Sequence, residues 1–332
     1  MTDRPAADVQ APLEPTPATP PGISLAAFRD YGIVVAFVAL FVTLAFASDV
    51  FFTKQNLLNI LFQAAPVGIM ACGGTLVFIA GGFDLSVGAI AAFAGVVAAT
   101  TAADVGAAGA LTLGALAGLG FGIFNGLLTT VGRINAFIAT LASSIIIRGV
   151  ALAITGGFLV SVDDPSFATL GLGEFADVRY PVFAWLGFAL FCGFLLWRTR
   201  FGRYVYASGG NPEAARLSGV RVGLVRGTTF AISGLSGGLA GIILASQIGT
   251  GQAEANPGIE FDAIAAVIIG GTSILGGEGA IWRSVLGALL FQLISNGFNL
   301  MNVQPVYQRV FLGVIMLVAV GLDAWARRTR TA

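Results

Sequence analysis

Long apolar segments dominate this chain of 332 residues and limit what it can fold into. Runs of about twenty residues with almost no charge recur along it, and an α-helix of that length crosses a hydrocarbon core of ~30 Å. Hydrophobic residues make up 56% of the chain and charged residues only 10%, whereas soluble domains carry about 25% charged residues. The sequence therefore predicts an all-α, polytopic bundle of transmembrane helices.

The apolar runs predict about ten spans. Glycine is abundant, with 46 residues, and small residues let helix backbones approach closely in lipid, so we expect a tightly packed bundle. The eighth predicted span is short and is interrupted by glycines. The predicted spans lie near residues 31–48, 64–80, 86–103, 108–130, 135–155, 181–197, 223–247, 262–275, 281–301 and 307–325.

Positive charge is concentrated on one side of this span map. An even number of spans places both termini on the same side, and that side carries most of the arginines. By the positive-inside rule, both termini and the loop 198–226 are predicted to be cytoplasmic. The arginines on that side are Arg4, Arg29, Arg133, Arg198, Arg200, Arg203, Arg216, Arg221, Arg226, Arg283, Arg327, Arg328 and Arg330. The opposite loops carry Lys54, Arg179 and Arg309, together with the acidic residues Asp49, Asp163, Asp164, Glu174, Asp177, Glu254, Glu260 and Asp262.

Two regions differ in composition. Residues 1–25 are polar and hold six of the 12 prolines, so they are predicted to form a disordered cytoplasmic tail. This tail lacks the basic start, short apolar core and cleavage site of a signal peptide, so we expect the first span to act as an uncleaved anchor. Residues 26–332 are predicted to form the transmembrane domain.

The residue inventory argues against several chemistries. Histidine is absent, and Cys72 and Cys192 both lie within apolar runs, so neither a metal site nor a disulfide framework is expected. The chain has no phosphate-binding loop of the Walker type, and its single lysine is Lys54, so it cannot hydrolyse ATP alone. We expect no catalytic residues, no cofactor bound by this chain and no nucleic-acid partner.

A short helix is predicted in the loop 198–226, within Ser208–Gly219. Asn211 is a suitable N-cap, and Pro212 falls at the first helical position, where its missing N–H costs nothing. Glu213 places negative charge at the positive end of the helix dipole, and Gly219 can end the helix in a left-handed conformation. The small apolar face at 214, 215, 217 and 218 suggests a docking surface; an ordinary surface helix is the alternative.

Several segments together resemble the inner-membrane permeases of ABC sugar importers, the ribose/xylose/arabinose/galactoside permease family. The matches run in consistent order from about residue 50 to 325, and five motifs in order are specific. The motifs are Gly81-Gly-Phe-Asp-Leu-Ser-Val-Gly88, Ala136-Phe-Ile-Ala-Thr-Leu141 with Arg148-Gly149, Thr199-Arg-Phe-Gly-Arg-Tyr204 leading to Gly209–Gly219, Phe261-Asp-Ala-Ile-Ala-Ala-Val267, and Gly270-Gly-Thr-Ser-Ile-Leu-Gly-Gly277.

This resemblance implies a division of labour between subunits. Such permeases pair in the membrane as homodimers or heterodimers, receive sugar from a periplasmic binding protein and are driven by two cytoplasmic ATPase subunits, which would bind ATP and Mg. Membrane lipid is the surrounding partner in a bacterial inner membrane. The short capped helix resembles the coupling helix that docks on the ATPase. Its predicted coupling residues are Asn211, Pro212, Glu213, Ala214, Ala215, Arg216, Leu217 and Gly219.

Polar residues within the spans are candidates for a sugar pathway. Asp84 either caps the third span or forms a polar hinge at the pathway. Arg148 either reaches the outer surface, lines the cavity or pairs with a carboxylate. The amides either face the pathway, where hydroxyl-rich ligands need neutral partners, or join helices. The tentative pathway residues are Asp84, Asn125, Arg148, Gln247, Gln292 and Asn296.

A weak internal echo leaves duplication open. Ile79-Ala-Gly-Gly82 and a span ending in Asn125-Gly126 are similar to Ile269-Gly-Gly271 and a span containing Asn296-Gly297. Paired glycine-broken segments mark pathways in many transporters, but in a chain this rich in glycine such matches also arise by chance.

The sequence as a whole favours an ABC importer permease for a monosaccharide or related polyol, working by alternating access. The alternative is an ion-coupled sugar carrier that needs no ATPase. A membrane enzyme lacks support because no paired acids, triad or metal site is found. The sequence does not identify the sugar.

Overall fold

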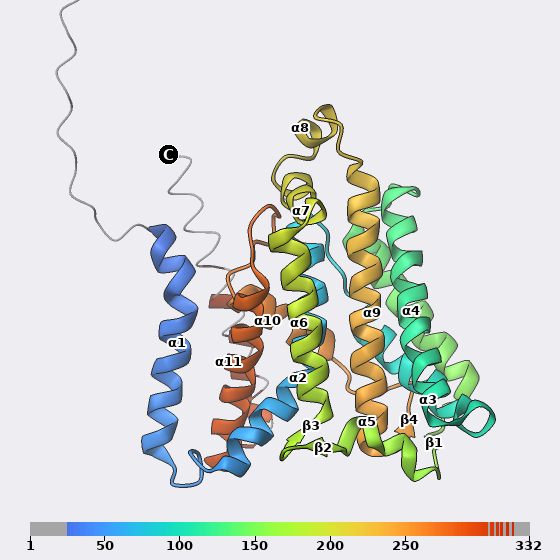
Figure 1. Ribbon diagram of the computed structural model, residues 1–332, viewed down its shortest axis with the longest axis vertical. Helices are drawn as coiled ribbons and strands as arrows, with labels where there is room; N and C mark the ends of the chain where they lie inside the picture. Colours follow the sequence, from blue (N-terminus) through green and yellow to red (C-terminus); the bar gives the residue numbers. More distant parts are fainter. Residues whose placement is uncertain are drawn as a thin grey trace, which may run out of the picture.

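The computed structural model describes residues 25–304, together with 306–308, 310, 311, 313, 314, 317, 318 and 321. The predicted N-terminal tail and most of the predicted last span lie outside the described residues. The main helices run roughly parallel in one bundle (Figure 1). The described helices of more than four residues are α1 (Leu25–Ala47), α2 (Lys54–Ile79), α3 (Val87–Thr130), α4 (Ala136–Thr155), α6 (Tyr180–Arg198), α7 (Arg200–Gly210), α8 (Pro212–Leu217), α9 (Val222–Ile248), α10 (Ile259–Ile269) and α11 (Ile281–Leu300).

Short elements lie at one end of the bundle, and α7 and α8 lie at the other (Figure 1). We call these the α5 end and the α8 end. The strands form two antiparallel pairs, with β1 against β4 and β2 against β3. The short elements are β1 (Val160–Ser161), η1 (Pro165–Ala168), α5 (Thr169–Leu172), β2 (Glu174–Phe175), β3 (Val178–Arg179) and β4 (Thr250–Gly251). The expectation of an all-α membrane protein is confirmed.

Five of the described helices are long and apolar enough to cross a membrane, namely α2, α3, α4, α6 and α9. The described part of α1 from residue 32 is a shorter apolar helix. The predicted span 281–301 coincides with α11, and the predicted span 262–275 overlaps α10 in part. The first difference is in α2, which begins at Lys54 rather than near residue 64 because polar residues of its first turns are still helical.

The helix α3 is a hairpin rather than one straight rod. Gly106 interrupts it with φ 72° and ψ 167°, a conformation that favours glycine. The Asn125 amide nitrogen donates to the Ser86 hydroxyl over 2.7 Å, although a straight helix would separate these residues by about 58 Å. The two halves correspond to the predicted spans 86–103 and 108–130.

The centre of the bundle is a close contact between the α3 hairpin and α9. A Cβ on Gly122 would lie 2.5 Å from the carbonyl oxygen of Phe230, and a Cβ on Gly126 would lie 2.8 Å from that of Gly227. These distances leave space for hydrogen only. The abundant glycine of the sequence therefore serves backbone contact here.

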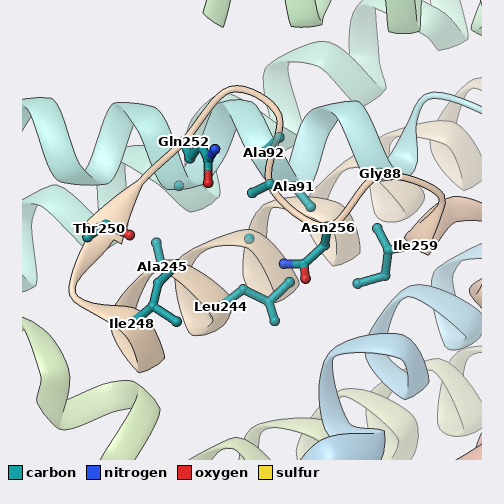
Figure 2. Close-up of a pocket in the computed structure, with 13 residues that line it drawn as sticks. Gly88, Ala91, Ala92, Leu244, Ala245, Ile248, Thr250, Gln252, Asn256 and Ile259 are labelled. Atoms are coloured by element: carbon teal, nitrogen blue, oxygen red, sulfur yellow. The ribbon is translucent and has the colours of Figure 1, made fainter. Parts of the chain in front are cut away.

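The helix α10 does not cross the bundle. Its 11 residues extend about 16 Å, roughly half of a hydrocarbon core. The preceding segment 249–258 runs back into the bundle, where Gly251 lies against α3: a Cβ on Gly251 would be 2.8 Å from the carbonyl oxygen of Gly95. Figure 2 shows this segment beside α3 and the end of α9. The predicted span 262–275 therefore begins and ends earlier than expected.

The helices α2 and α10 end in the same way. In both, a glycine with φ 76° follows the last turn, Gly81 in one case and Gly271 in the other. In both, the next N–H reaches back five residues, from Gly82 to Val77 and from Thr272 to Val267. The two similar sequence segments, Ile79–Gly82 and Ile269–Gly271, thus form the same local structure, a left-handed cap at the C-terminus of a helix.

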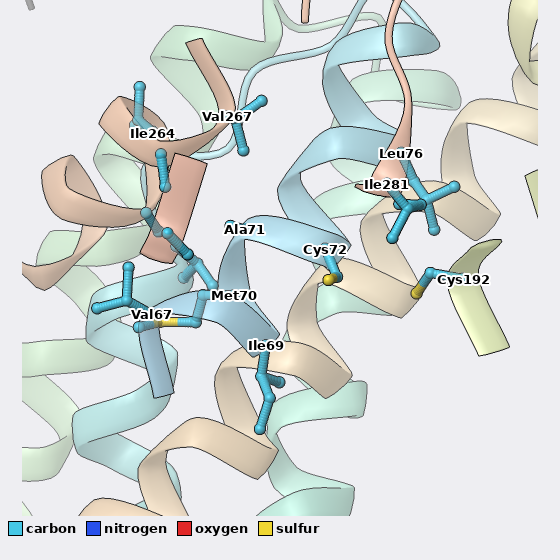
Figure 3. Packing of buried hydrophobic residues seen from close by; sticks show 14 of the residues in the cluster. Val67, Ile69, Met70, Ala71, Cys72, Leu76, Cys192, Ile264, Val267 and Ile281 are labelled. Atoms are coloured by element: carbon cyan, nitrogen blue, oxygen red, sulfur yellow. The ribbon is translucent and has the colours of Figure 1, made fainter. Parts of the chain in front are cut away.

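The hydrophobic core surrounds α2. From residue 64 onward nearly every α2 side chain is buried, and it packs against α6, α9, α10 and α11. Cys72 of α2 and Cys192 of α6 are buried and free, and Figure 3 shows both among the buried side chains around α2. The helix α2 is therefore enclosed by four other helices of the bundle.

We expect Gly122→Ala to destabilise the protein, because the new methyl group would overlap the backbone of α9. Overpacking of this kind costs about 1–3 kcal/mol. Thermal unfolding in detergent checks the effect. Gly120→Ala, on the same half of α3 but with nothing within 4 Å of its Cβ, is the matched control. Equal melting temperatures for the two variants would contradict the close contact.

Candidate functional site

The short helix α8 is present with both of the predicted caps. The Asn211 side chain accepts from the Ala214 N–H over 2.9 Å, and Pro212 occupies the first turn. Gly219 follows the helix with φ 84°. The carboxylate of Glu213 pairs with Arg216 at 2.6 Å, with both side chains largely exposed. Two turns of helix are thus fixed at both ends.

The exposed face of α8 differs from the predicted one. Ala215 was expected on the docking face, but it is only 6% exposed and faces the protein itself. That expectation is wrong because α8 packs against α7 and the start of α9, and Ala215 is the position that fills this contact. Leu217 is 80% exposed. The outward face is formed by Pro212, Glu213, Ala214, Arg216, Leu217 and Ser218.

The base of this projection is joined to the bundle by Arg226 of α9. Its guanidinium donates to the carbonyl of Ala80 at the end of α2 over 2.9 Å and to that of Ser208 in α7 over 3.1 Å. Three glycine pairs meet beside it, at 81–82, 209–210 and 276–277, and the Gly277 N–H donates to the Ile79 carbonyl over 2.8 Å. The ends of α2 and α7 and the loop after α10 therefore form one unit.

Sequence reasoning counted Arg226 only as a positive charge. Its partners are main-chain carbonyls 146 and 18 residues away. Because every residue has a main-chain carbonyl, the sequence does not indicate which ones a side chain binds. The one available signal is that Arg226 lies some four residues inside an apolar span, where a cation needs a partner.

Asp84 and Asn125 meet in one buried polar cluster. Asp84 Oδ1 accepts from the backbone N–H and the hydroxyl of Ser86 at 2.9 and 2.6 Å, and Oδ2 accepts from the Ser233 hydroxyl of α9 at 2.7 Å. Ser86 in turn receives the Asn125 amide. Asp84 is therefore not the N-cap of α3, which is Ser86; it joins the loop before α3 to α9.

Arg148 is paired with carboxylates. Its guanidinium lies 3.6 Å from Glu260 at the start of α10 and 3.9 Å from Glu254, and its side chain is 18% exposed. It also donates to the Ala253 carbonyl at 3.4 Å. Of the three alternatives predicted for Arg148, the structure therefore shows pairing with carboxylates. These contacts join α4 to the start of α10 and to the segment before it.

Asn296 is used in a helix contact. Its amide and that of Asn56 exchange hydrogen bonds of 2.7 and 3.2 Å between α11 and α2, and both residues are buried. The pair is 240 residues apart in sequence, so nothing in the local pattern of either helix identifies it.

The remaining predicted pathway residues, Gln247 and Gln292, line one cavity of ≈ 480 Å³. It lies between α2, α9, α10 and α11. Sequence reasoning missed its other polar side chains, which come from α2, the segment before α10, α10 and α11. The polar lining consists of Gln63, Gln247, Asn256, Asp262, Gln292 and Ser295.

A second polar cavity, of ≈ 410 Å³, lies at the α5 end. Here Lys54 Nζ lies 2.7 Å from an Asp177 carboxylate oxygen. The hydrogen bond and the charge of Lys54 hold the pKa of Asp177 below its ordinary value. Beside them, the Arg179 guanidinium stacks 4.3 Å from the centre of the Phe62 ring. The charged groups of this end thus surround an aromatic ring on α2.

A bundle of long apolar helices, with a capped helix projecting from one end, defines a multi-pass membrane protein. Comparison with known protein families identifies the family of this membrane protein. Residues 56–320 match the family described as "Branched-chain amino acid transport system / permease component". The chain belongs to this family of permease components.

Several curated relatives are ABC-type permeases. The chain is 40% identical to the ribose import permease protein RbsC of Escherichia coli K12 over 298 residues, covering 86% of this chain and 92% of the relative. It is 38% identical to the L-arabinose ABC transporter permease protein AraH of Azospirillum brasilense over 307 residues, covering 91% and 89%. No solved structure matches the chain.

These matches confirm three expectations from the sequence. The resemblance to the sugar-importing ABC permeases is real, the chain is a permease subunit rather than a catalytic one, and it is a multi-pass protein of the inner membrane. The roles assigned to individual coupling and pathway residues stay predictions.

We expect Asp84→Ala to destabilise the junction between α3 and α9, because it leaves buried hydroxyls of Ser86 and Ser233 without their acceptor. An unsatisfied buried group costs about 1–3 kcal/mol. Thermal unfolding of Asp84→Ala, Ser233→Ala and the double variant measures the coupling. The double variant should lose less than the sum of the two single losses; strict additivity would show that the two side chains do not interact.

Proposed function

We propose that this chain is the membrane-spanning subunit of an ABC importer that moves a monosaccharide or related polyol into the cell by alternating access. The observation that carries the proposal is similarity to ribose and arabinose permeases along at least 86% of the chain. ATP and Mg²⁺ would bind to partner ATPase subunits, and sugar would arrive on a periplasmic binding protein.

In this proposal the chain has ten spans, both termini are cytoplasmic and the α8 end faces the cytoplasm. The distribution of charge supports this orientation. Arg198, Arg203, Arg216 and Arg221 lie at or near the α8 end, whereas Asp163, Asp164, Glu174 and Asp177 belong to the α5 end. The positive-inside rule places the arginine-rich end in the cytoplasm.

The coupling helix in this proposal is α8. Its position beyond the ends of the long helices supports the role (Figure 1), as does the exposed Leu217, because large exposed apolar side chains are suited to insertion into a partner. Closure of two ATPase subunits would move α8 and α7. Arg226 would carry this movement to the end of α2, and the joined loops would follow.

The subunit partners follow from the same orientation. The binding protein would dock at the α5 end, where β1–β4 and α5 lie. A second copy of the chain, or a homologous permease, would complete the transporter in the membrane. The six predicted pathway residues would act in the interior, with Asp84, Asn125, Arg148 and Asn296 holding helices together around the route.

Uptake in vesicles tests the proposal. Reconstituted with its ATPase and binding protein, the chain should support ATP-dependent uptake of ribose, arabinose or a related sugar, and without the ATPase it should support almost none. Uptake driven by a proton or sodium gradient in the absence of any ATPase would instead identify an ion-coupled carrier.

We expect Leu217→Asp to release most of the ATPase, because a charge buried without a partner at an interface costs several kcal/mol. The measurement is co-purification of the ATPase together with sugar uptake. Leu172→Asp is the control for co-purification of the ATPase, since Leu172 is also exposed, at 46%, but lies on α5 at the opposite end. If Leu217→Asp retained the ATPase and Leu172→Asp lost it, both the docking helix and the orientation would be wrong.

A further inference from the structure

Another cavity, of ≈ 470 Å³, lies beside the turn that joins α3 to α4. Its wall is formed by this turn (residues 129–137), by the start of α9 and by the loops after α2 and α10. The turn belongs to the α8 end, because α3 contacts the start of α9 there, at Gly126 and Gly227. The volume falls within the range of about 300–1,000 Å³ that is typical of small-molecule sites. None of the predicted coupling or pathway residues lines this cavity.

The lining of this cavity is cationic. Arg133 and Arg226 line it, and no acidic residue is among the described residues that do so. Asp84, which follows the loop after α2, is buried, and its carboxylate is already bound to Ser86 and Ser233. The positive charge of the cavity is therefore not balanced by a carboxylate of its own lining, and this favours an anionic ligand.

Arg133 gains nothing from the rest of the described chain. It makes no hydrogen bond or ion pair to any described residue. Its backbone has φ 53°, which lies in the left-handed region that favours glycine. The next N–H, of Ile134, donates back to the Leu128 carbonyl over 3.2 Å, as in a left-handed cap at the end of a helix. An arginine at a position suited to glycine, with its guanidinium unpaired, is available to a ligand.

Arg226 offers a second guanidinium, which is fixed in place. Its Nε and Nη2 donate to the carbonyls of Ala80 and Ser208. The other terminal nitrogen, Nη1, makes no hydrogen bond to a described residue. Guanidinium groups match the oxygens of a phosphate well, because their N–H donors form a rigid planar fork. The two arginines reach the cavity from different elements, the α3–α4 turn and α9.

The start of α4 adds to the positive field. Ala136 and Phe137, the first residues of this 20-residue helix, line the cavity, and the positive end of a helix dipole favours anions. The side-chain oxygen of Asn135 accepts from the N–H groups of Phe137 and Ile138. Its amide nitrogen makes no hydrogen bond to a described residue and remains a donor toward the cavity.

Large apolar side chains are exposed around the same turn. Val131 is 74% exposed, and Ile134 and Phe137, which also line the cavity, are 42% and 48% exposed. Leu127 and Ile138, on the adjoining turns of α3 and α4, are exposed as well. A soluble anion such as inorganic phosphate gains nothing from this apolar surface, whereas the acyl chains of a lipid can cover it. Cationic cavity and apolar rim together match an anionic phospholipid.

We propose that the cavity beside the α3–α4 turn binds the phosphate group of an anionic phospholipid, whose acyl chains lie on the exposed apolar side chains of this turn. Arg133 and Arg226 bind its phosphate oxygens. Because Arg226 also holds the ends of α2 and α7, the bound lipid joins the α3–α4 turn to that unit. In the proposed orientation this lipid belongs to the cytoplasmic leaflet. The site goes beyond the proposed function and does not depend on which compound is transported.

Thermal unfolding of the full chain in an uncharged detergent tests this site. Phosphatidylglycerol should raise the melting temperature by about 3 °C or more, and the same amount of phosphatidylcholine should raise it less. Arg133→Gly should require roughly tenfold more phosphatidylglycerol for half of this rise, because a charge-assisted hydrogen bond is lost. Glycine adopts a φ of this sign without strain, so with phosphatidylcholine the variant should melt no lower than the unaltered chain.

Two further variants separate a defined site from general attraction of charge. Arg133→Lys keeps the positive charge and should keep most of the affinity for phosphatidylglycerol. Arg221→Gln should leave the affinity unchanged, because Arg221 is exposed near the same end but lies outside the cavity. Equal weakening by Arg133→Gly and Arg221→Gln would overturn the proposal, and so would an equal rise in melting temperature with the two lipids.

Other occupants of the cavity and its rim are tested separately. Glycerol 3-phosphate should not raise the melting temperature at the concentrations where phosphatidylglycerol does; an equal rise would identify a site for soluble phosphate compounds instead. Val131→Cys, in a chain that also carries Cys72→Ala and Cys192→Ala, should form no linked dimers when membranes are treated with an oxidant. Efficient linkage would show that a second copy of the chain covers the rim, and would overturn the assignment to lipid.

Discussion

The rest of the structure depends on the close contact between the α3 hairpin and α9. Glycines on both sides bring backbone against backbone, so the two elements behave as one packed body. In a membrane the hydrophobic effect does not hold helices together, and close van der Waals contact takes its place. This contact fixes the start of α3 in the interior, and through Ser233 it fixes Asp84 as well.

The helix α9 makes contacts in three separate regions because it runs the length of the bundle. Near its start Arg226 binds the ends of α2 and α7, in its middle Ser233 binds Asp84, and near its end Gln247 lines the polar cavity. The helix α9 is thus in contact with the base of the α7–α8 projection near one end and with the polar cavity near the other. In the proposed transporter it would be the element that joins these two regions.

Local sequence patterns predicted a large part of this structure. Apolar runs located most helices, and the sequence around Asn211 and Gly219 predicted both caps of α8, because a cap depends on neighbouring residues only. Local patterns did not predict that Ala215 is buried, because its burial depends on packing against α7 and α9. They also did not predict the pairing of Asn56 with Asn296, which are far apart in the sequence. The course of segment 249–258 into the bundle was missed, because its glycines and polar residues are typical of a loop outside the membrane. Of the cavity lining, only Gln247 and Gln292 were singled out.

The brevity of α8 has a consequence for assembly. Six residues form too short a helix to persist on its own, and its support comes only from two caps and one buried alanine. A leucine that is almost fully exposed at its tip adds a site of unwanted adhesion. If α8 binds the ATPase as proposed, the partner would cover this leucine and support the short helix. Association of the subunits would then also complete the folding of this projection.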